Sequence, residues 1–553
     1  MASASSTLDT MVLSIAQSLS AVERTFYKLP GSAIIERYVR SSHQNDPGRT
    51  FLELIIFFLV VRTLLQSRTR ADRNNGKNFI EFTDKEIDEL VEDWVPEPLW
   101  KPLNDVEAAE LAAIPVVAGH NGPYPTLVNT GKPAINLASL NFTGLANNEH
   151  VKQRSLEAMR RYGVGSCGPT GFYGSFGRNW LCVIDVGIAD SSSLDAHLQC
   201  ENDIAEFLDT EGAILYSQGF STISSAIPAF CKRGDIIVAD RAVTLAIQKG
   251  MEISRSTIRW YDHNDLHSLE EVLQSVEKER RKRKGPLTRR FIITEGIFER
   301  DGTMTDLPKL IELKQKYKYR LILDESFSFG TVGRTGRGLT ELYNVKASKV
   351  DMLVGSCAIG LCASGGFCAG SRTVVEHQRI NSPAYVFSAS MPPLLAVSAS
   401  EGINVLRDTP SLLTRLQENV RAARVILDQV ECISIPSHRA SPIIHLYLRN
   451  NSSSDNLLHP SASMSSSKPS NPSSPMPRDA PVFDIEKEER LLQEVVEEAM
   501  AQGVMITKAK RARGLEITEA QPSIRLAMSS ALSKADTEKA VHVLVKILKR
   551  KFR

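Results

Sequence analysis

The sequence has almost no excess of charge of either sign. Its 553 residues include 66 lysines and arginines against 64 aspartates and glutamates, a formal net charge of +2 at neutral pH. A protein that binds nucleic acid usually presents a surplus of basic side chains to the phosphate backbone. The balanced charge therefore argues against a nucleic-acid-binding protein.

Cysteine is also scarce. The eight cysteines are at positions 167, 182, 200, 231, 357, 362, 368 and 432, and no two of them form a CxxC pair. This scatter excludes the common zinc-finger and thioredoxin-like motifs. We expect free thiols in a reducing compartment and no metal site.

Long hydrophobic runs are missing as well. The most apolar segment is FLELIIFFLVVRTLLQ at 51–66, in which the longest uncharged run, Leu54 to Val61, is only eight residues. A membrane-spanning helix needs about 20 apolar residues, although Glu53 and Arg62 stand near the ends, where long side chains reach toward lipid headgroups. The segment is either a short membrane helix or a buried core helix. Apolar residues at helical spacing between Leu8 and Phe26 would suit an interfacial helix ahead of it, or packing against protein.

The middle of the chain alternates between two patterns. Strand-like runs at 291–294 (FIIT), 320–324 (RLILD) and 350–355 (VDMLVG) are separated by a helical pattern at Leu307–Tyr317, which Asp306 precedes as a cap. This alternation predicts an α/β fold, with a mostly parallel sheet that helices cover on both faces. Ligands of such folds bind at the carboxyl ends of the strands, where Asp324 falls.

A smaller α+β domain is predicted after Pro392, from a long helix, a strand at 442–448, and helices at 485–502 and 534–549. Residues 450–475 contain 11 serines and 4 prolines in 26 residues, which predicts a disordered insertion. The expected organisation is therefore an amphipathic segment (1–50), a membrane helix (51–66), a linker and arm (67–132), a large domain (133–391) and a small domain (392–553, disordered at 450–480).

Several motifs in a fixed order resemble those of the α-oxoamine synthases, enzymes that use pyridoxal 5'-phosphate (PLP) to condense an amino acid with an acyl-CoA. The motifs are YGVGSCGPTGFYGS at 162–175, HLQCE at 197–201, RGDIIVAD at 233–240, LILDESFSFG at 321–330, FSASMPP at 387–393 and QPSIRLAMS at 521–529. The resemblance covers roughly residues 90 to 545 and implies a PLP-dependent transferase of fold type I.

The reactive positions of that family are altered here. Its catalytic members carry D-x-x-x-G-x-x-x-K followed after six residues by Gly-Gly, and counting from Asp351 or back from Gly365 gives Ile359 in place of the lysine. Isoleucine has no amine with which to bind the cofactor or move a proton. Thr244 stands where the family's ring-stacking histidine is expected, and Phe327 replaces the histidine of D-x-x-H.

Within that family, the chain resembles the non-catalytic, first long-chain-base subunits of serine palmitoyltransferase. These subunits have a membrane segment ahead of a sequence similar to VEDWVPEPLW at 91–100. The resemblance implies a heterodimer with the catalytic second long-chain-base subunit, which holds PLP covalently, and possible small regulatory membrane subunits. It implies condensation of L-serine with palmitoyl-CoA at the endoplasmic reticulum membrane, with the main body in the cytosol.

The resemblance also assigns expected contacts. Asp324 is the residue that could pair with the cofactor ring nitrogen, although a strand-end aspartate that caps a turn is the alternative. Ser388 and Ser390 would reach across the dimer toward the cofactor phosphate, Arg525 would receive a substrate carboxylate, and Cys167 would border the partner's substrate pocket or only form a tight turn.

Two alternatives remain open at this point. The chain could be an autonomous enzyme with a relocated lysine, or a membrane scaffold or sensor that completes no active site. One stretch departs from the subunit pattern, because residues 177–194 form an atypical insertion, either genuine or derived from a retained intron.

Overall fold

The computed structural model describes residues 32–45, 47–75, 83–94, 102–103, 105–112, 114–128, 130–164, 168, 192–282, 288–449, 485–512 and 514–552. The predictions for the segment from Leu8 to Phe26, for Cys167, for the insertion at 177–194 and for the serine-rich segment at 450–480 lie outside these residues. The chain divides into an N-terminal unit, Met1–Asp105, and a main unit, Val106–Arg553.

Three helices make up the described part of the N-terminal unit: α2 (Ser32–Asn45), α3 (Pro47–Asn75) and α4 (Asp84–Asp93). The predicted apolar helix at 51–66 lies within α3, and its apolar side chains from Phe51 to Val60 are exposed, including Ile56 at 51% and Phe57 at 64%. Over the described ranges, no helix combines the length and the apolar run that would let it cross a membrane.

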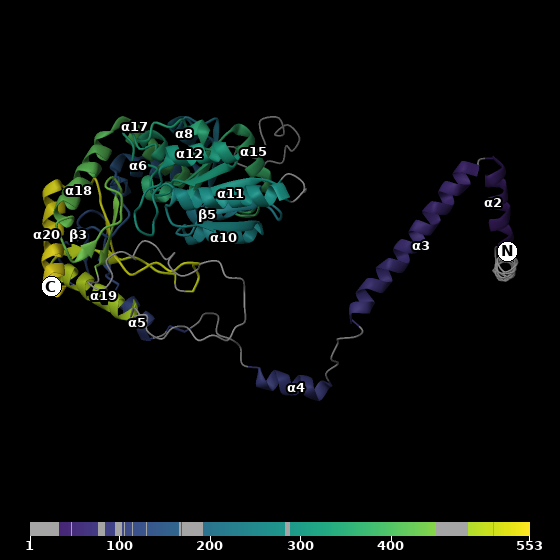
Figure 1. Cartoon of the computed structure of the whole chain (residues 1–553), viewed down its shortest axis with the longest axis horizontal. Coiled ribbons are helices and arrows are strands. Elements are labelled where there is room, and N and C mark those ends of the chain that lie inside the picture. Colours follow the sequence, from purple (N-terminus) through teal and green to yellow (C-terminus); the bar gives the residue numbers. More distant parts are fainter. Residues whose placement is uncertain are drawn as a thin grey trace. The chain divides into compact units, whose positions relative to one another are not determined.

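The main unit, whose strand β5 and surrounding helices are labelled in Figure 1, is built on a seven-stranded sheet. The strand order is β4-β10-β9-β8-β7-β5-β6. Strand β10 is antiparallel to both of its neighbours, and the strands from β9 to β6 are parallel to one another. The predicted mostly parallel sheet is therefore confirmed. The strands are β4 (Gly212–Tyr216), β5 (Ile236–Asp240), β6 (Thr257–Tyr261), β7 (Arg290–Glu295), β8 (Arg320–Asp324), β9 (Met352–Ser356) and β10 (Gly366–Gly370).

Helices cover both faces of this sheet, and successive side chains of a strand enter the cores on opposite faces. Ile293 packs in the core beneath one face, whereas its neighbour Ile292 packs in the core beneath the other. The first core includes α9 (Gly219–Phe230), α10 (Leu245–Ser254), α15 (Arg372–Asn381) and α16 (Pro383–Phe387). The second includes α8 (Ser192–Leu208), α11 (Leu266–Lys282), α12 (Leu307–Tyr317) and α17 (Pro393–Asp408).

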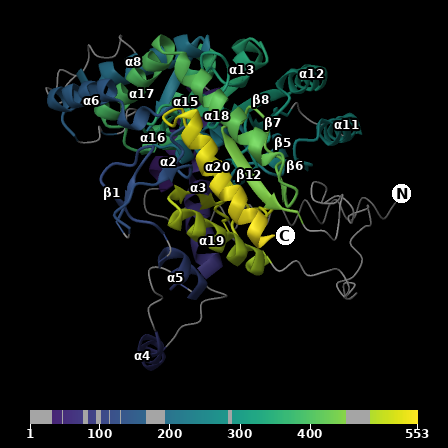
Figure 2. The same ribbon diagram turned by 90° about the vertical axis from the view of Figure 1, so that its left-hand side faces the viewer.

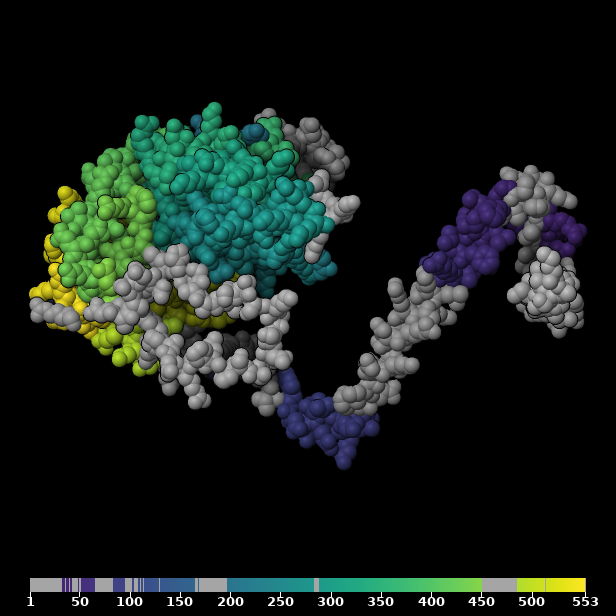
Figure 3. All heavy atoms as spheres, viewed as in Figure 1, coloured from purple at the N-terminus to yellow at the C-terminus, as the bar shows by residue number. Residues whose placement is uncertain are grey.

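The C-terminal domain is the predicted smaller α+β layer. Its antiparallel sheet has the order β11-β12-β15-β14, with strands β11 (Ile433–Ser434), β12 (Ile443–Leu448), β14 (Thr507–Lys508) and β15 (Ile524–Ala527). Helix α20 (Lys534–Lys551) lies against α18 (Ser411–Leu427) and α19 (Ile485–Ala501) (Figure 2). One hydrophobic core runs from the large domain into the small one. In Figure 3 the two domains form a continuous surface.

The remaining elements of the main unit are short or peripheral: α5 (Asp105–Ala112), β1 (Val117–Ala118), β2 (Thr126–Leu127), β3 (Ile135–Asn136), η1 (Leu145–Asn147), α6 (Glu149–Tyr162), α13 (Leu339–Leu342), η2 (Ala347–Lys349), α14 (Cys357–Gly360) and β13 (Val504–Met505).

The single long helix predicted after Pro392 is wrong. The segment forms two helices, α17 and α18, and the break falls at Thr409-Pro410. Proline has no amide hydrogen to continue the helix and disfavours a helical residue before it, so Thr409 adopts φ −128° and ψ 65°.

A tight hairpin at 297–304 joins the large domain to the small one. Four consecutive carbonyls of the hairpin accept hydrogen bonds from the small domain. The ring of His445 lies 3.0 Å from the oxygen of Glu299, Tyr447 donates to Arg300, Ser437 donates to Asp301, and the amide of His438 donates to Gly302 at 2.9 Å. We call this set of contacts the interdomain joint.

Candidate functional site

A cleft of about 520 Å³ opens at the carboxyl ends of the parallel strands. The large domain supplies the loops after β5, β7, β8 and β9, and the small domain supplies β12, β15 and the loop after β14. Sites of α/β folds form at this edge, so the position agrees with the sequence-based expectation for Asp324.

Five residues singled out in the sequence line this one cleft, although they are up to 281 positions apart: Thr244, Asp324, Phe327, Ile359 and Arg525. Thr244 is the N-cap of α10, Asp324 ends β8, Ile359 lies in α14 and Arg525 lies in β15. The structure brings them together. Whether any of them contacts a cofactor or substrate stays a prediction.

The loop that carries Ile359 is closely packed. The hydroxyl of Ser356 accepts the amide of Ala358 at 3.2 Å and so caps the short helix α14. A methyl group on Gly360 would lie 2.3 Å from the carbonyl oxygen of Phe329, a distance that backbone does not tolerate. The loop thus has a fixed shape, and it presents the partly buried side chain of Ile359 to the cleft.

Two buried carboxylates lie side by side at the strand ends. Glu295 and Asp324 are register partners on β7 and β8, and they are 2% and 6% exposed. Burial, and then the neighbouring charge of Asp324, raises the pKa of Glu295 well above its usual value, and burial also raises the pKa of Asp324. Backbone amides of Thr244 and Glu299 donate to Glu295, and the amide of Ser326 donates to Asp324 at 2.9 Å.

The small-domain side of the cleft carries the positive charge. Arg525 has a buried Nε with no hydrogen-bond partner, and burial lowers its pKa while the charge of Glu299 opposes that change. His445, paired with Arg525 across β12 and β15, has its pKa lowered by burial to about 4 and is therefore neutral. An uncompensated donor next to open space suits an anionic group such as a carboxylate.

Among the residues that line the cleft, only some fit PLP. Asp324 suits a protonated ring nitrogen, and the N-terminus of α9 at Gly219 and Phe220 suits a phosphate. Ile359 offers no amine, and Thr244 offers no ring to stack. Lys510 is the one lysine of the described residues that lines the cleft, and it lies on the small-domain loop. Lys349 precedes β9, at the other end of that strand.

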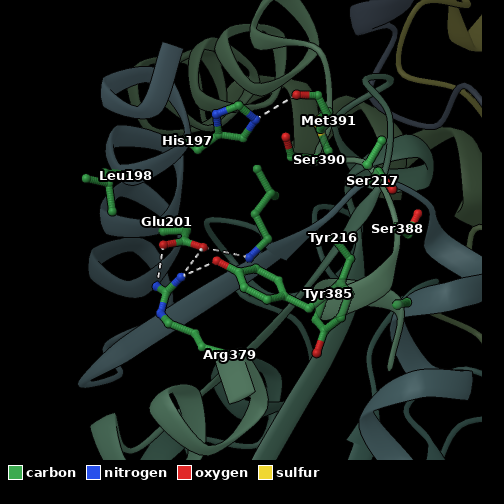
Figure 4. A pocket seen from close by; sticks show the side chains of 13 residues that line it. His197, Leu198, Glu201, Tyr216, Ser217, Arg379, Tyr385, Ser388, Ser390 and Met391 are labelled. Carbon is green, nitrogen blue, oxygen red and sulfur yellow. Dashed lines mark hydrogen bonds and ion pairs between the residues drawn. The ribbon is translucent and has the colours of Figure 1, made fainter. Parts of the chain in front are cut away.

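Ser388 and Ser390 lie elsewhere. They line a second pocket of about 30 Å³, which is shown in Figure 4. An ion pair of 2.6 Å between Arg379 and Glu201 closes one side, and Arg379 also donates to Tyr385 at 2.7 Å. These contacts tie α8 to α15 and α16. Within this chain the two serines therefore do not reach the cleft, and a role across a dimer stays a prediction.

The sequence analysis missed several residues of the cleft, among them Glu295, Glu299, Lys510 and His445. Glu295 directly follows the predicted strand at 291–294, so its position at a strand end was a usable signal. His445 and Lys510 had no such signal, because only the pairing of the small-domain sheet brings them to the cleft.

Comparison with known proteins places the chain among enzymes of this fold. The model of the aminotransferase class I and II family matches residues 133–544. Long chain base biosynthesis protein 1 of Arabidopsis thaliana is 38% identical over 413 residues, covering 74% of this chain and 79% of that protein. Serine palmitoyltransferase 1 of Dictyostelium discoideum is 37% identical over 488 residues, covering 87% and 90%. Serine palmitoyltransferase 1 of Saccharomyces cerevisiae is 33% identical over 539 residues, covering 93% and 91%.

Solved structures share the fold at lower identity. Serine palmitoyltransferase of Sphingomonas wittichii superposes with a TM-score of 0.63 at 19% identity, covering 81% of this chain and 97% of that one. A serine palmitoyltransferase structure with PLP gives 0.64 at 17%, covering 85% and 99%. The chain belongs to the class I and II aminotransferase family, and within it to the relatives named serine palmitoyltransferase 1 and long chain base biosynthesis protein 1.

Proposed function

We propose that the chain is the non-catalytic subunit of serine palmitoyltransferase. The complete enzyme condenses L-serine with palmitoyl-CoA to 3-ketosphinganine, CO2 and CoA, the first step of sphingolipid synthesis. The partner is the lysine-bearing second long-chain-base subunit, which holds PLP. The observation that carries the proposal is Ile359, which stands in an intact strand-end loop at the position where an amine is needed.

The segment 387–391 supports a role for this chain at a heterodimer interface. Phe387 is 75% exposed, and Ser388 and Ala389 beside it are exposed too. An aromatic side chain in open solvent next to small polar residues is typical of a surface that another chain covers. In the proposed dimer, Ser388 and Ser390 donate hydrogen bonds toward the cofactor phosphate in the partner, and Cys167 borders the partner's substrate pocket.

The chain alone should form no covalent bond with PLP, because no lysine lies at position 359. We expect that borohydride treatment of the full chain with PLP leaves no phosphopyridoxyl-lysine detectable by mass spectrometry. Ile359→Lys should also fail to give condensation activity in the chain alone, since Thr244 and Phe327 supply no histidine.

Lys510 makes the competing proposal of an autonomous enzyme testable. If reduction does label the chain, and Lys510→Ala but not Lys349→Ala abolishes the label, the lysine has been relocated and the non-catalytic assignment is wrong. Lys349 is the matched control because it lies at the far end of β9 from the cleft.

The heterodimer is tested separately by co-expression with a lysine-bearing homologue. We expect the two chains to purify together and to condense serine with palmitoyl-CoA, while neither does so alone. Phe387→Asp should reduce co-purification, and Val425→Asp, at an apolar side chain of similar exposure (64%) on α18, should not. Co-purification without activity would favour a scaffold or sensor.

We place the protein at the endoplasmic reticulum membrane, with its main unit in the cytosol. Helix α3 supports this, because its apolar side chains from Leu52 to Val60 are exposed to solvent. Burying them in lipid or against a membrane protein would be favourable. Small regulatory membrane subunits are candidates for such a partner.

A further inference from the structure

The pair of carboxylates at the deep edge of the cleft lacks a cation. Neither Glu295 nor Asp324 forms an ion pair with any lysine, arginine or histidine that the structure describes. Their hydrogen-bond partners are neutral: backbone amides and, for Asp324, also the side chain of Ser326. Two adjacent buried carboxylates repel each other when both are ionised, and either a proton or another positive charge relieves that repulsion.

Within the described ranges, the charged bases that line the cleft are Arg300, Lys510 and Arg525, and none of them forms an ion pair with Glu295 or Asp324. Arg300 pairs with Glu516 at 3.2 Å, and Arg525 and Lys510 act electrostatically on Glu299. Glu299 is a third carboxylate on the way between the two ends, and burial raises its pKa. The charge of the cleft is therefore divided between the domains: Lys510 and Arg525 come from the small domain, and the pair Glu295 and Asp324 comes from the strand ends of the large domain.

The wall beside the negative pair is apolar. Its side chains come from α9, α10 and the loops after β5, β7, β8 and β9, together with Leu140, and they are Leu140, Phe220, Ile223, Val243, Leu245, Ile297, Phe327 and Ile359. A cleft of about 520 Å³ has the volume of an ordinary small-molecule site. Buried carboxylates next to an aliphatic wall match an amphiphile with a cationic head.

We propose that this cleft binds a primary alkylamine, with its ammonium group at Glu295 and Asp324 and its hydrocarbon chain along the wall that includes Ile359. The replacement of lysine by isoleucine creates this site, because it removes the competing internal ammonium and adds apolar surface. The choice of a long-chain amine as the natural ligand rests on the proposed function, whose product is such an amine. The preference for an alkylammonium ion stands on the cleft itself.

Binding is tested on the full chain by calorimetry, with n-octylamine as the probe and 1-octanol as its uncharged match. We expect octylamine to bind at least tenfold more tightly than octanol or spermidine, because it alone has both the charge and the chain. Because burial raises the pKa of both carboxyl groups, binding of octylamine should also displace protons, which is measured as a heat that depends on the buffer.

Variants locate the site. Glu295→Gln with Asp324→Asn keeps the acceptor oxygens and should weaken octylamine binding at least tenfold, without lowering the melting temperature. Ile359→Lys should weaken it equally by placing an ammonium in the cleft. Glu516→Gln is the control, since that carboxylate lines the cleft but is already paired with Arg300, and it should change binding less than twofold.

Three results would overturn the inference: equal binding of octylamine and octanol, equal binding of spermidine and octylamine, or tight binding of PLP in place of octylamine that Asp324→Asn abolishes. Failure of the proposed function is distinguishable from each of them, since it appears as activity of the chain without its partner, and the binding of octylamine is measured without substrates.

Discussion

Two histidines that contact the hairpin at 297–304 respond to pH in opposite directions: the partly buried His263, which contacts the side chain of Asp301, and the buried His445 of the interdomain joint. His263 lies 2.9 Å from Asp240 and 2.9 Å from Asp301. Burial lowers its pKa, but the hydrogen bonds and charges of both carboxylates outweigh this and raise the pKa to about 10. The stabilisation is therefore complete below the unfolded value of 6.5 and is lost as the pH rises toward about 10.

His445 shows the reverse. Burial lowers its pKa from 6.5 to about 4, so the neutral ring is stabilising above about pH 6.5 and this contribution is lost as the pH falls toward about 4. The contribution of His445 is lost as the pH falls toward about 4, and that of His263 is lost as the pH rises toward about 10. The two contributions together are therefore largest close to neutral pH.

We predict that His263→Gln lowers the free energy of unfolding by about 2–4 kcal/mol at about pH 6, and by less as the pH approaches 10. For His445→Gln, the difference from the unaltered chain should narrow as the pH falls from about 6.5 to about 4. Denaturant titrations over this pH range measure both. His267→Gln is the control, because its side chain is 83% exposed. Differences that do not change with pH would contradict the assignment.

At the scale of one element, the hairpin at 297–304 depends on glycine at its turn. Gly302 has φ +73°, and a methyl group there would lie 2.6 Å from the oxygen of Ile443 and 2.7 Å from the hydroxyl of Ser437. Both neighbours belong to the small domain, so an added side chain would push the two domains apart. The backbone conformation adds a strain of its own.

Gly302→Ala should therefore cost about 3 kcal/mol of stability, combining left-handed strain with the clash. Gly234→Ala is the matched control, since Gly234 has φ +96° but no atom within 4 Å of the added methyl group, and it should cost only about 1 kcal/mol. Thermal unfolding of the two variants compares them directly. Equal losses of stability in the two variants would mean that the hairpin shifts to accommodate the added methyl group. The joint would then be weaker than its contacts indicate.

The elements that sequence patterns predicted best are those with a clear period and a stop signal. The strand at 320–324 matches β8 at both ends, and α12 covers the predicted Leu307–Tyr317, with the carboxylate of Asp306 accepting the amide of Lys309. The prediction of one long helix was wrong because the helical spacing of apolar residues continues across Pro410, although the proline ends the first helix there.

At the scale of the whole molecule, the cleft was only half predictable. Its large-domain residues follow strands, so strand ends located Asp324 and the loop of Ile359. The small-domain half is set by the register that pairs His445 with Arg525, and no local pattern encodes a pairing between strands so far apart in the chain. Arg525 itself was found only because its motif resembles a known one.

We expect the N-terminal unit to decide the location of the protein. We predict that the full chain stays with membranes after carbonate extraction at high pH, because burying the exposed apolar residues of α3 in lipid is favourable. Ile56→Arg with Leu59→Arg should release it, whereas Leu515→Arg, at a leucine of 59% exposure in the main unit, should not. A chain that is fully extracted without any substitution would remove α3 as an anchor.

The interdomain joint has a consequence for how such a protein can change over generations. On the hairpin side it uses carbonyl oxygens, which every amino acid carries, whereas the side chains of Glu299 and Arg300 line the cleft. Substitutions at these positions change the side chains of the cleft but leave the carbonyl contacts of the joint intact. The chemistry of the cleft is therefore uncoupled from the packing of the two domains. A lineage could therefore exchange reactive groups for inert ones, as at Ile359, without passing through an unfolded ancestor.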